Sequence, residues 1–164
     1  MLLKHEANKK KFEIFLEVAG ELNKAETTPV LFGSLGLMKI VGEFKEADDV
    51  DILMEKKESK EEKRKLLEVM FGLGFKLKDE KRYEFEREGE VVSFTGFNKL
   101  PNFEISPNDF KVSEERGIKF KELSAKDYLL FYRNMLKKKE RQKEKGKDDQ
   151  KKITVIKQYL REKN

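Results

Sequence analysis

The sequence predicts an α+β fold, a mixed β-sheet flanked by helices with further helices at the C-terminal end. Apolar residues recur every three or four positions in several long stretches, which is typical of amphipathic helices. Short apolar or alternating runs lie between those stretches, which is typical of strands. The order helix, strand, strand, helix, strands, helix, helix contains no internal repeat. We therefore expect one domain over 1–164, in three parts: an N-terminal helix (1–24), a core of sheet and helix (28–123) and C-terminal helices (124–164).

The first expected helix has apolar residues at helical spacing. These are Phe12, Phe15, Leu16, Ala19 and Leu22. Thr27-Thr28-Pro29 ends this helix, because proline cannot continue it. A strand is expected over 30–32 and ends at Gly33-Ser34. A short helix or turn over 35–41 and a second strand over 50–54 follow.

The next helix is expected to begin at Ser59, because Ser59 and Glu62 form a capping-box pair. Gly72 and Gly74 end it. Glu88-Gly89 predicts a hairpin turn. The strands around it are expected at 75–77, 83–86 and 90–95.

The C-terminal part is predicted to be mostly helical. The segment 96–108 is irregular, and a last strand is expected over 118–123. Ser124 and Asp127 predict the start of a helix. The stretch 137–147 is almost entirely charged, so the final helix is expected to begin only at Asp148-Asp149.

Composition excludes several kinds of site. The chain has no cysteine, which excludes disulfides and thiolate metal sites, and its one histidine excludes a multi-histidine zinc site. No apolar run is long enough to cross a bilayer and no signal peptide is recognised, so we expect a cytoplasmic protein without membrane contact. The 37 basic and 32 acidic residues leave a net charge of +5, which permits contact with nucleic acid without requiring it. The abundance of Lys and Glu resembles that of hyperthermophile proteins.

The segment Val30–Met54 is the part of the sequence that points most directly to chemistry. An apolar strand ends at Gly33-Ser34, where free backbone amides and a hydroxyl can meet a phosphate. Asp49 and Asp51 lie two positions apart at the start of the next strand and so project from one face. Paired carboxylates are hard oxygen ligands suited to Mg²⁺ or Mn²⁺. The alternative interpretation is an exposed acidic edge beside an ordinary turn.

This segment resembles the signature of the polymerase-beta-type nucleotidyltransferase superfamily, in particular its minimal and abortive-infection toxin-like members. The resemblance implies that Gly33 and Ser34 hold the triphosphate of an NTP and that Asp49 and Asp51 bind the catalytic Mg²⁺ or Mn²⁺. Weaker resemblances to the same proteins follow the motif, at 59–75, 123–130 and 147–160. The implied reaction transfers a nucleoside monophosphate from the NTP to a hydroxyl on an unidentified acceptor, which is RNA (tRNA included), a protein or a small molecule.

One expected carboxylate is missing. Catalytic members of the superfamily carry a third carboxylate on a later strand, and here Ser93 occupies that place. Glu90 and Glu104 are the candidates to complete the metal site, although Glu90 faces away from Ser93 in a regular strand. Glu84 and Glu86, on the preceding arm of the hairpin, are further alternatives.

Two functions therefore remain open. The first is a metal-dependent nucleotidyltransferase. The second is a catalytically degraded module that binds RNA or regulates a partner, for example within a toxin–antitoxin pair. The basic stretch 137–152 fits phosphate contacts, but interspersed acids favour a solvated helix end stabilised by i,i+4 ion pairs.

Overall fold

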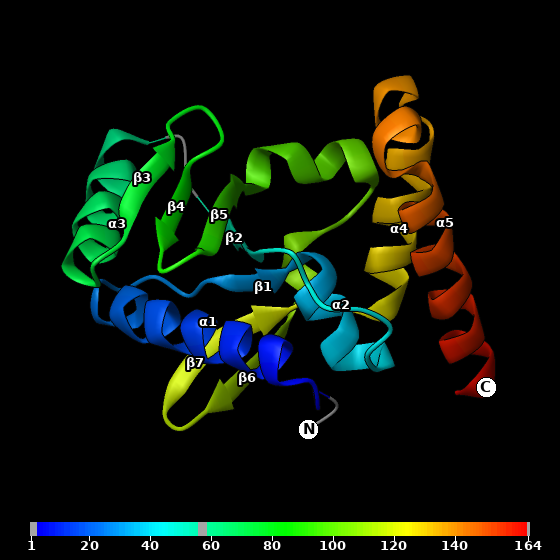
Figure 1. The fold of residues 1–164 in the computed structure, drawn as a ribbon, viewed down its shortest axis with the longest axis horizontal. Helices are drawn as coiled ribbons and strands as arrows, with labels where there is room; N and C mark the ends of the chain where they lie inside the picture. Colours follow the sequence, from blue (N-terminus) through cyan, green and yellow to red (C-terminus); the bar gives the residue numbers. More distant parts are fainter. Residues whose placement is uncertain (1–2, 56–58, 164) are drawn as a thin grey trace.

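The computed structural model describes residues 3–55 and 59–163. The described part of the chain forms one mixed sheet with helices on both of its faces (Figure 1). The helices are α1 (Glu6–Lys24), α2 (Gly33–Val41), α3 (Lys60–Gly72), α4 (Ala125–Leu136) and α5 (Lys139–Glu162), with short 3₁₀ segments η1 (Phe97–Phe103) and η2 (Pro107–Asp109). The strands are β1 (Val30–Phe32), β2 (Val50–Met54), β3 (Lys76–Asp79), β4 (Glu84–Arg87), β5 (Glu90–Gly96), β6 (Lys111–Glu115) and β7 (Ile118–Glu122). The expected α+β fold is thus confirmed.

The sheet has the strand order β3-β4-β5-β2-β1-β7-β6 among the described residues. Strand β2 is antiparallel to β1 and parallel to β5, and β1 is parallel to β7. Hairpins β3–β4, β4–β5 and β6–β7 complete the sheet on either side. The segment Val30–Met54 therefore lies at the centre of the sheet, where neighbours on both sides fix its position.

The two faces of the sheet are covered by different helices. One core cluster joins α1 and α3 to the residues of β2, β4, β5 and β7 that point toward them, including Ile52 and Phe94. The other joins α4 and α5 to the opposite face, through Val30, Phe32 and Leu53. No helix in the described ranges is long and apolar enough to cross a membrane.

Several local predictions are confirmed. Glu88-Gly89 forms the turn between β4 and β5, where Arg87 pairs with Glu90. Ser59 accepts a hydrogen bond from the Glu62 amide at the start of α3, which confirms the serine half of the expected capping box.

Two predictions about the C-terminal part are corrected. Helix α5 begins at Lys139 and not at Asp148. Arg141 forms hydrogen bonds to the buried Asp149 within the helix, and this pair stabilises a charged segment that the composition alone indicated to be exposed to solvent. Strand β6 was not expected, because its exposed residues show little apolar alternation. It forms by pairing with β7.

Candidate active site

The two aspartates of the motif lie at the centre of the sheet. Asp51 in β2 is the register partner of Phe32 in β1 and of Ser93 in β5. Asp49 lies two positions before it, just ahead of the strand. Because side chains alternate along a strand, Val50 between them enters the core while the aspartates share the opposite face.

Gly33 brings the other half of the motif against these carboxylates. It is the first residue of α2 and has φ +69°, in the left-handed region that favours glycine. A Cβ at this position would overlap the Asp51 carboxylate and would lie 2.9 Å from the Asp51 Cβ. The N-terminus of α2, which lacks a side-chain cap from Phe32, therefore lies directly beside Asp51. Helix N-termini of this kind favour negatively charged ligands.

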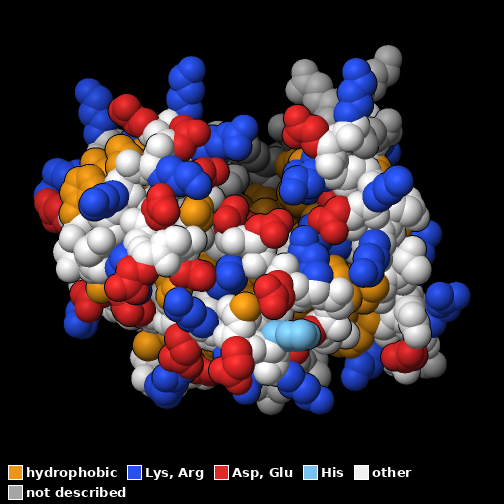
Figure 2. Space-filling view, in the orientation of Figure 1, with side chains coloured by type: hydrophobic (Ala, Val, Ile, Leu, Met, Phe, Trp, Pro, Cys, Tyr) orange, Lys and Arg blue, Asp and Glu red, His pale blue; other side chains and the backbone are white. Residues whose placement is uncertain are grey.

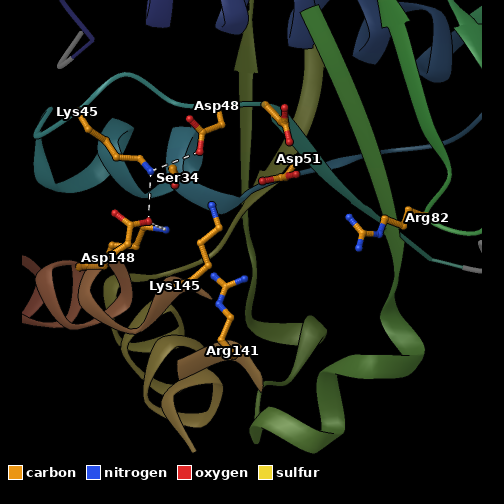
Figure 3. Close-up of a pocket in the computed structure, with 10 residues that line it drawn as sticks. Ser34, Lys45, Asp48, Asp51, Arg82, Arg141, Lys145 and Asp148 are labelled. Carbon is orange, nitrogen blue, oxygen red and sulfur yellow. Dashed lines mark hydrogen bonds and ion pairs between the residues drawn. The ribbon is translucent and has the colours of Figure 1, made fainter. Parts of the chain in front are cut away.

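A pocket of about 350 Å³ opens over this junction (Figure 3). Ser34 and the aspartates Asp48, Asp49 and Asp51 line one side of it. Residues of α5 line the facing side, and Arg82 approaches from the turn between β3 and β4. The α5 residues are Arg141, Lys145, Asp148 and Lys152. Figure 2 shows a hollow between the sheet and the C-terminal helices, with both acidic and basic side chains around it.

Ion pairs fix part of the α5 wall. Lys45, in the loop before β2, lies 3.3 Å from Asp148 and 3.8 Å from Asp48. The buried Lys152 lies 3.2 Å from Asp148. Lys45 and Lys152 thus share Asp148, which links the loop that leads to the aspartates to helix α5.

Arg141 is held by a different carboxylate. It donates two hydrogen bonds to the fully buried Asp149, at 2.8 and 3.0 Å. By contrast, Lys145 and Arg82 have no ion pair within the described residues. These two cations remain available to a ligand in the pocket.

Nearby positive charge compensates the two carboxylates only in part. Burial, followed by the negative charge of Asp49, raises the pKa of the Asp51 carboxyl to about 7, with Lys152 opposing the shift. Burial and then the charge of Glu84 raise the pKa of Asp49. A cation bound between the two carboxylates would relieve both effects.

The donor set fits a divalent metal that also contacts a phosphate ligand. Among the described residues, no group of three or more His, Cys, Asp or Glu side chains could by itself hold a metal ion. Mg²⁺, however, is usually bound by one or two carboxylates together with water and substrate phosphates. Asp49 and Asp51 are the two carboxylates that could form such a pair, and the beginning of α2 is where phosphates could bind.

The expected third carboxylate is not at either preferred position. Glu90 pairs with Lys11 of α1 at 3.3 Å, on the other face of the sheet. Glu104 is exposed after η1. Neither residue lines a pocket that contains Asp49 and Asp51. The structure thus favours neither Glu90 nor Glu104 as a metal ligand.

Glu84 is the glutamate that the fold brings toward the aspartates. It is the register partner of Ser93, which is itself the partner of Asp51. A second pocket, of about 300 Å³, contains Asp49, Asp51, Ser93 and Glu84. The sequence could not favour Glu84 over Glu90 as the third carboxylate. That choice depends on how β4 pairs with β5 and β5 with β2, and therefore on which face of the sheet each glutamate lies.

Asn8 of α1 holds the loop that leads to the aspartates. Its buried side-chain amide donates to the Lys45 carbonyl at 3.0 Å and to the Glu43 carboxylate at 2.8 Å. Its oxygen accepts from the Ala47 amide at 2.8 Å. The approach to β2 is therefore fixed from the opposite side of the molecule to α5.

The sequence interpretation considered phosphate contacts for the stretch 137–152 but favoured a solvated helix end, whereas the structure places four residues of this stretch in the pocket wall. Its signal was nevertheless present. Arg141, Lys145, Asp148 and Lys152 are separated by four, three and four positions, which places them on one helical face. Two of the interspersed acids, Asp149 and Asp148, are the partners of Arg141 and Lys152.

Comparison with known proteins identifies relatives by sequence and by structure. No protein-family model matches the chain. The uncharacterized protein YnaI of Bacillus subtilis (strain 168) is 30% identical over 154 residues, which cover 93% of this chain and 99% of YnaI.

Two solved structures share the fold. An antigenic nucleotidyltransferase-like protein from Paracoccidioides brasiliensis matches with a TM-score of 0.60 and 16% identity, over 90% of this chain and 75% of its own. ANT(2")-Ia, solved in complex with adenylyl-2"-tobramycin, matches with a TM-score of 0.59 and 9% identity, over 90% and 88%.

Proposed function

The chain belongs to the family of B. subtilis YnaI and has the nucleotidyltransferase fold, and on this basis we propose that it transfers a nucleoside monophosphate from an NTP to a hydroxyl acceptor. The observation that carries the proposal is the contact between the two halves of the motif. Gly33 packs against the Asp51 carboxylate, so the N-terminus of α2 and the paired aspartates open into one pocket. A triphosphate and its counter-cation need these two features side by side.

Each part of the pocket has a role in this proposal. The Ser34 hydroxyl and the first amides of α2 bind phosphate oxygens. Lys145 and Arg82 add positive charge to the same ligand. Asp49 and Asp51 hold Mg²⁺ or Mn²⁺, which when bound would neutralise negative charge on the phosphates.

The reaction is a displacement at the α-phosphorus of the NTP. The acceptor oxygen forms a bond to this phosphorus, and the bond to the oxygen that bridges to the β-phosphate breaks. Pyrophosphate leaves. The protein contributes mainly by holding the triphosphate so that the leaving oxygen lies opposite the attacking one.

The test is transfer from an NTP labelled at the α-phosphate, with Mg²⁺ and a panel of acceptors that includes RNA, protein and small molecules. We expect pyrophosphate release and a labelled product, both lost in Asp49→Ala and Asp51→Ala. Lys126→Ala, on the exposed start of α4, is a matched control that should retain activity. The proposal fails if no acceptor is labelled and the two aspartate variants behave like the wild type.

A second candidate function has a specific observation in its favour. Ser93, and not a carboxylate, stands beside Asp51 on β5. On this alternative the chain is a non-catalytic module that uses the cations of α5 to bind RNA, or that regulates a partner protein such as the other member of a toxin–antitoxin pair. It predicts salt-dependent RNA binding weakened by Lys145→Ala, or capture of a specific partner, with no pyrophosphate release.

A further inference from the structure

Asp51, Ser93 and Glu84 form a row across three neighbouring strands. Ser93 is the register partner of Asp51 in the parallel pair β2–β5 and of Glu84 in the antiparallel pair β4–β5. Register partners point to the same face, and neighbouring strands lie about 4.8 Å apart. The Glu84 carboxylate therefore extends over Ser93 from the strand beyond it, toward the aspartates.

The pocket above this row is distinct from the one beneath α5. Besides the row and Asp49 it is lined by Lys81, Arg82, Phe94 and Thr95, and it has a volume of about 300 Å³. It shares Asp49, Asp51 and Arg82 with the first pocket. Two ligands, one in each pocket, would thus meet at the same two carboxylates from different sides.

The first pocket contains the α2 N-terminus and the α5 cations, which suit a triphosphate, whereas the second contains neither. The second pocket offers the hydroxyls of Ser93 and Thr95 together with Glu84. Lys81, which lines the second pocket and not the first, is exposed in the turn before β4 and has no ion pair within the described residues. Such a lining suits a hydroxyl compound that also carries a phosphate ester.

Glu84 differs from the aspartates in its surroundings. Its side chain is partly buried and has no ion pair or hydrogen bond within the part of the chain that the structure describes. Together with Asp49 and Asp51 it does not form a group that could hold a metal ion by itself among the described residues. These properties fit a group that receives a proton better than a metal ligand.

We propose that the second pocket binds the acceptor, a hydroxyl compound bearing a phosphate ester, and that Glu84 accepts the proton of the attacking hydroxyl. This inference rests on the proposed function and adds the acceptor class and the base. The acceptor oxygen forms its bond to the α-phosphorus while its O–H bond breaks. The proton passes to the Glu84 carboxylate, and the electron pair of the broken P–O bond leaves with pyrophosphate.

The base is tested by Glu84→Gln, with Glu86→Gln as the matched control. Glu86 lies two positions along the same strand, is exposed and lines neither pocket. We expect Glu84→Gln to lower kcat roughly 100-fold or more, while the thermal shift on adding ATP with Mg²⁺, and the affinity for Mn²⁺ measured by electron paramagnetic resonance, stay as in the wild type. Glu86→Gln should change none of these quantities.

The acceptor class is tested with three probes: ribose 5-phosphate, an RNA octamer with a free 3′ hydroxyl, and ribose. Pyrophosphate release should be stimulated by a phosphate-bearing probe and not by ribose, and the responding probe distinguishes a small phosphate ester from a nucleic-acid end. Lys81→Ala should raise the KM of that probe roughly tenfold, the expected loss of one charge-assisted contact. Lys76→Ala, on the exposed β3, should not.

The contrary outcomes separate this inference from the proposal beneath it. A Glu84→Gln variant that retains more than about a tenth of kcat, or that loses Mn²⁺ affinity, overturns the role of Glu84 as a base. The acceptor class is overturned if ribose stimulates pyrophosphate release as strongly as the phosphate-bearing probes do. It is also overturned if none of the three probes stimulates the release while ATP is still cleaved to pyrophosphate. Absence of pyrophosphate under every condition overturns the proposed function and this inference with it.

Discussion

The two faces of strands β2 and β5 are built from alternate residues of the same short segments, yet they differ sharply around Asp51. On one face Val50, Ile52, Val92 and Phe94 are at most 1% exposed and pack beneath α1 and α3. On the other face Asp51, Ser93 and Thr95 line open pockets. The apolar face determines where each strand lies, and the polar face acquires its geometry as a result.

This difference teaches that stability and chemistry should respond to different substitutions within a single strand. A change on the apolar face should unfold the protein, and the activity of the remaining folded molecules should be normal. A change on the polar face should abolish activity in a protein that is at least as stable. The predictions below test that separation, from the largest expected effect to the smallest.

Asp51→Asn is expected to have the largest effect. Removing one of the two charges that we propose bind the metal should lower the rate of pyrophosphate release by about 1,000-fold, on the scale of single electrostatic groups in active sites. Thermal unfolding in the absence of metal should occur at the same temperature or higher, because a poorly compensated buried charge is lost. A variant that is both active and destabilised would break the proposed separation.

Ile52→Ala, the neighbouring residue on the opposite face, should do the reverse. Truncating a fully buried isoleucine typically costs about 2–5 kcal/mol of unfolding free energy, to be measured by urea denaturation. The thermal shift with ATP and Mg²⁺ should persist. Val112→Ala provides a control, since Val112 is 62% exposed and its truncation should cost little.

Gly33→Ala should combine the two effects. The left-handed backbone would cost roughly 1–2 kcal/mol, and the new methyl group would displace the Asp51 carboxylate, so that activity also falls. Gly89→Ala is the matched control, because Gly89 has φ +82° and nothing within 4 Å of an added Cβ. It should lose a similar amount of stability and keep full activity; equal activity in both variants would contradict the steric argument.

The last prediction concerns the pH dependence of stability. The Asp51 carboxyl has a pKa raised from 3.8 to about 7, so between these values the folded protein keeps a proton that the unfolded chain has released. The free energy of unfolding of the metal-free protein should therefore fall as pH rises from about 4 to about 7 and then level off. Unfolding of Asp51→Asn should lack this component. A difference between the two proteins that does not change with pH would contradict the raised pKa.

The sequence predicted the local features of this molecule better than those that depend on distant pairing. The strands at Val30 and Val50, the turn at Glu88-Gly89 and the capping pair Ser124–Asp127 were recognised because each is encoded by adjacent residues. The roles of Gly33, Ser34, Asp49 and Asp51 in nucleotide and metal binding remain predictions, although Gly33 and Asp51 are in contact as the motif required.

What the sequence could not predict depends on tertiary structure. The predicted start of α5 was wrong because the high charge of the segment indicated exposure to solvent. In the structure, Arg141 and Asp149 form a hydrogen-bonded pair within the helix. Glu84 was left among the alternatives because its position depends on pairings of β4 with β5 and of β5 with β2. Neither relation is visible in a local window.

The hydrogen bonds of Asn8 have a practical consequence for handling this protein. Asn8 lines neither pocket, yet it holds the Lys45 carbonyl and the Ala47 amide in the loop that enters β2. Shortening the chain from its N-terminus, which most domains tolerate at their exposed ends, would here release the loop on which the aspartates depend. Truncations should therefore leave α1 intact, and proteolysis within the first turns of α1 should inactivate the protein without touching its pocket.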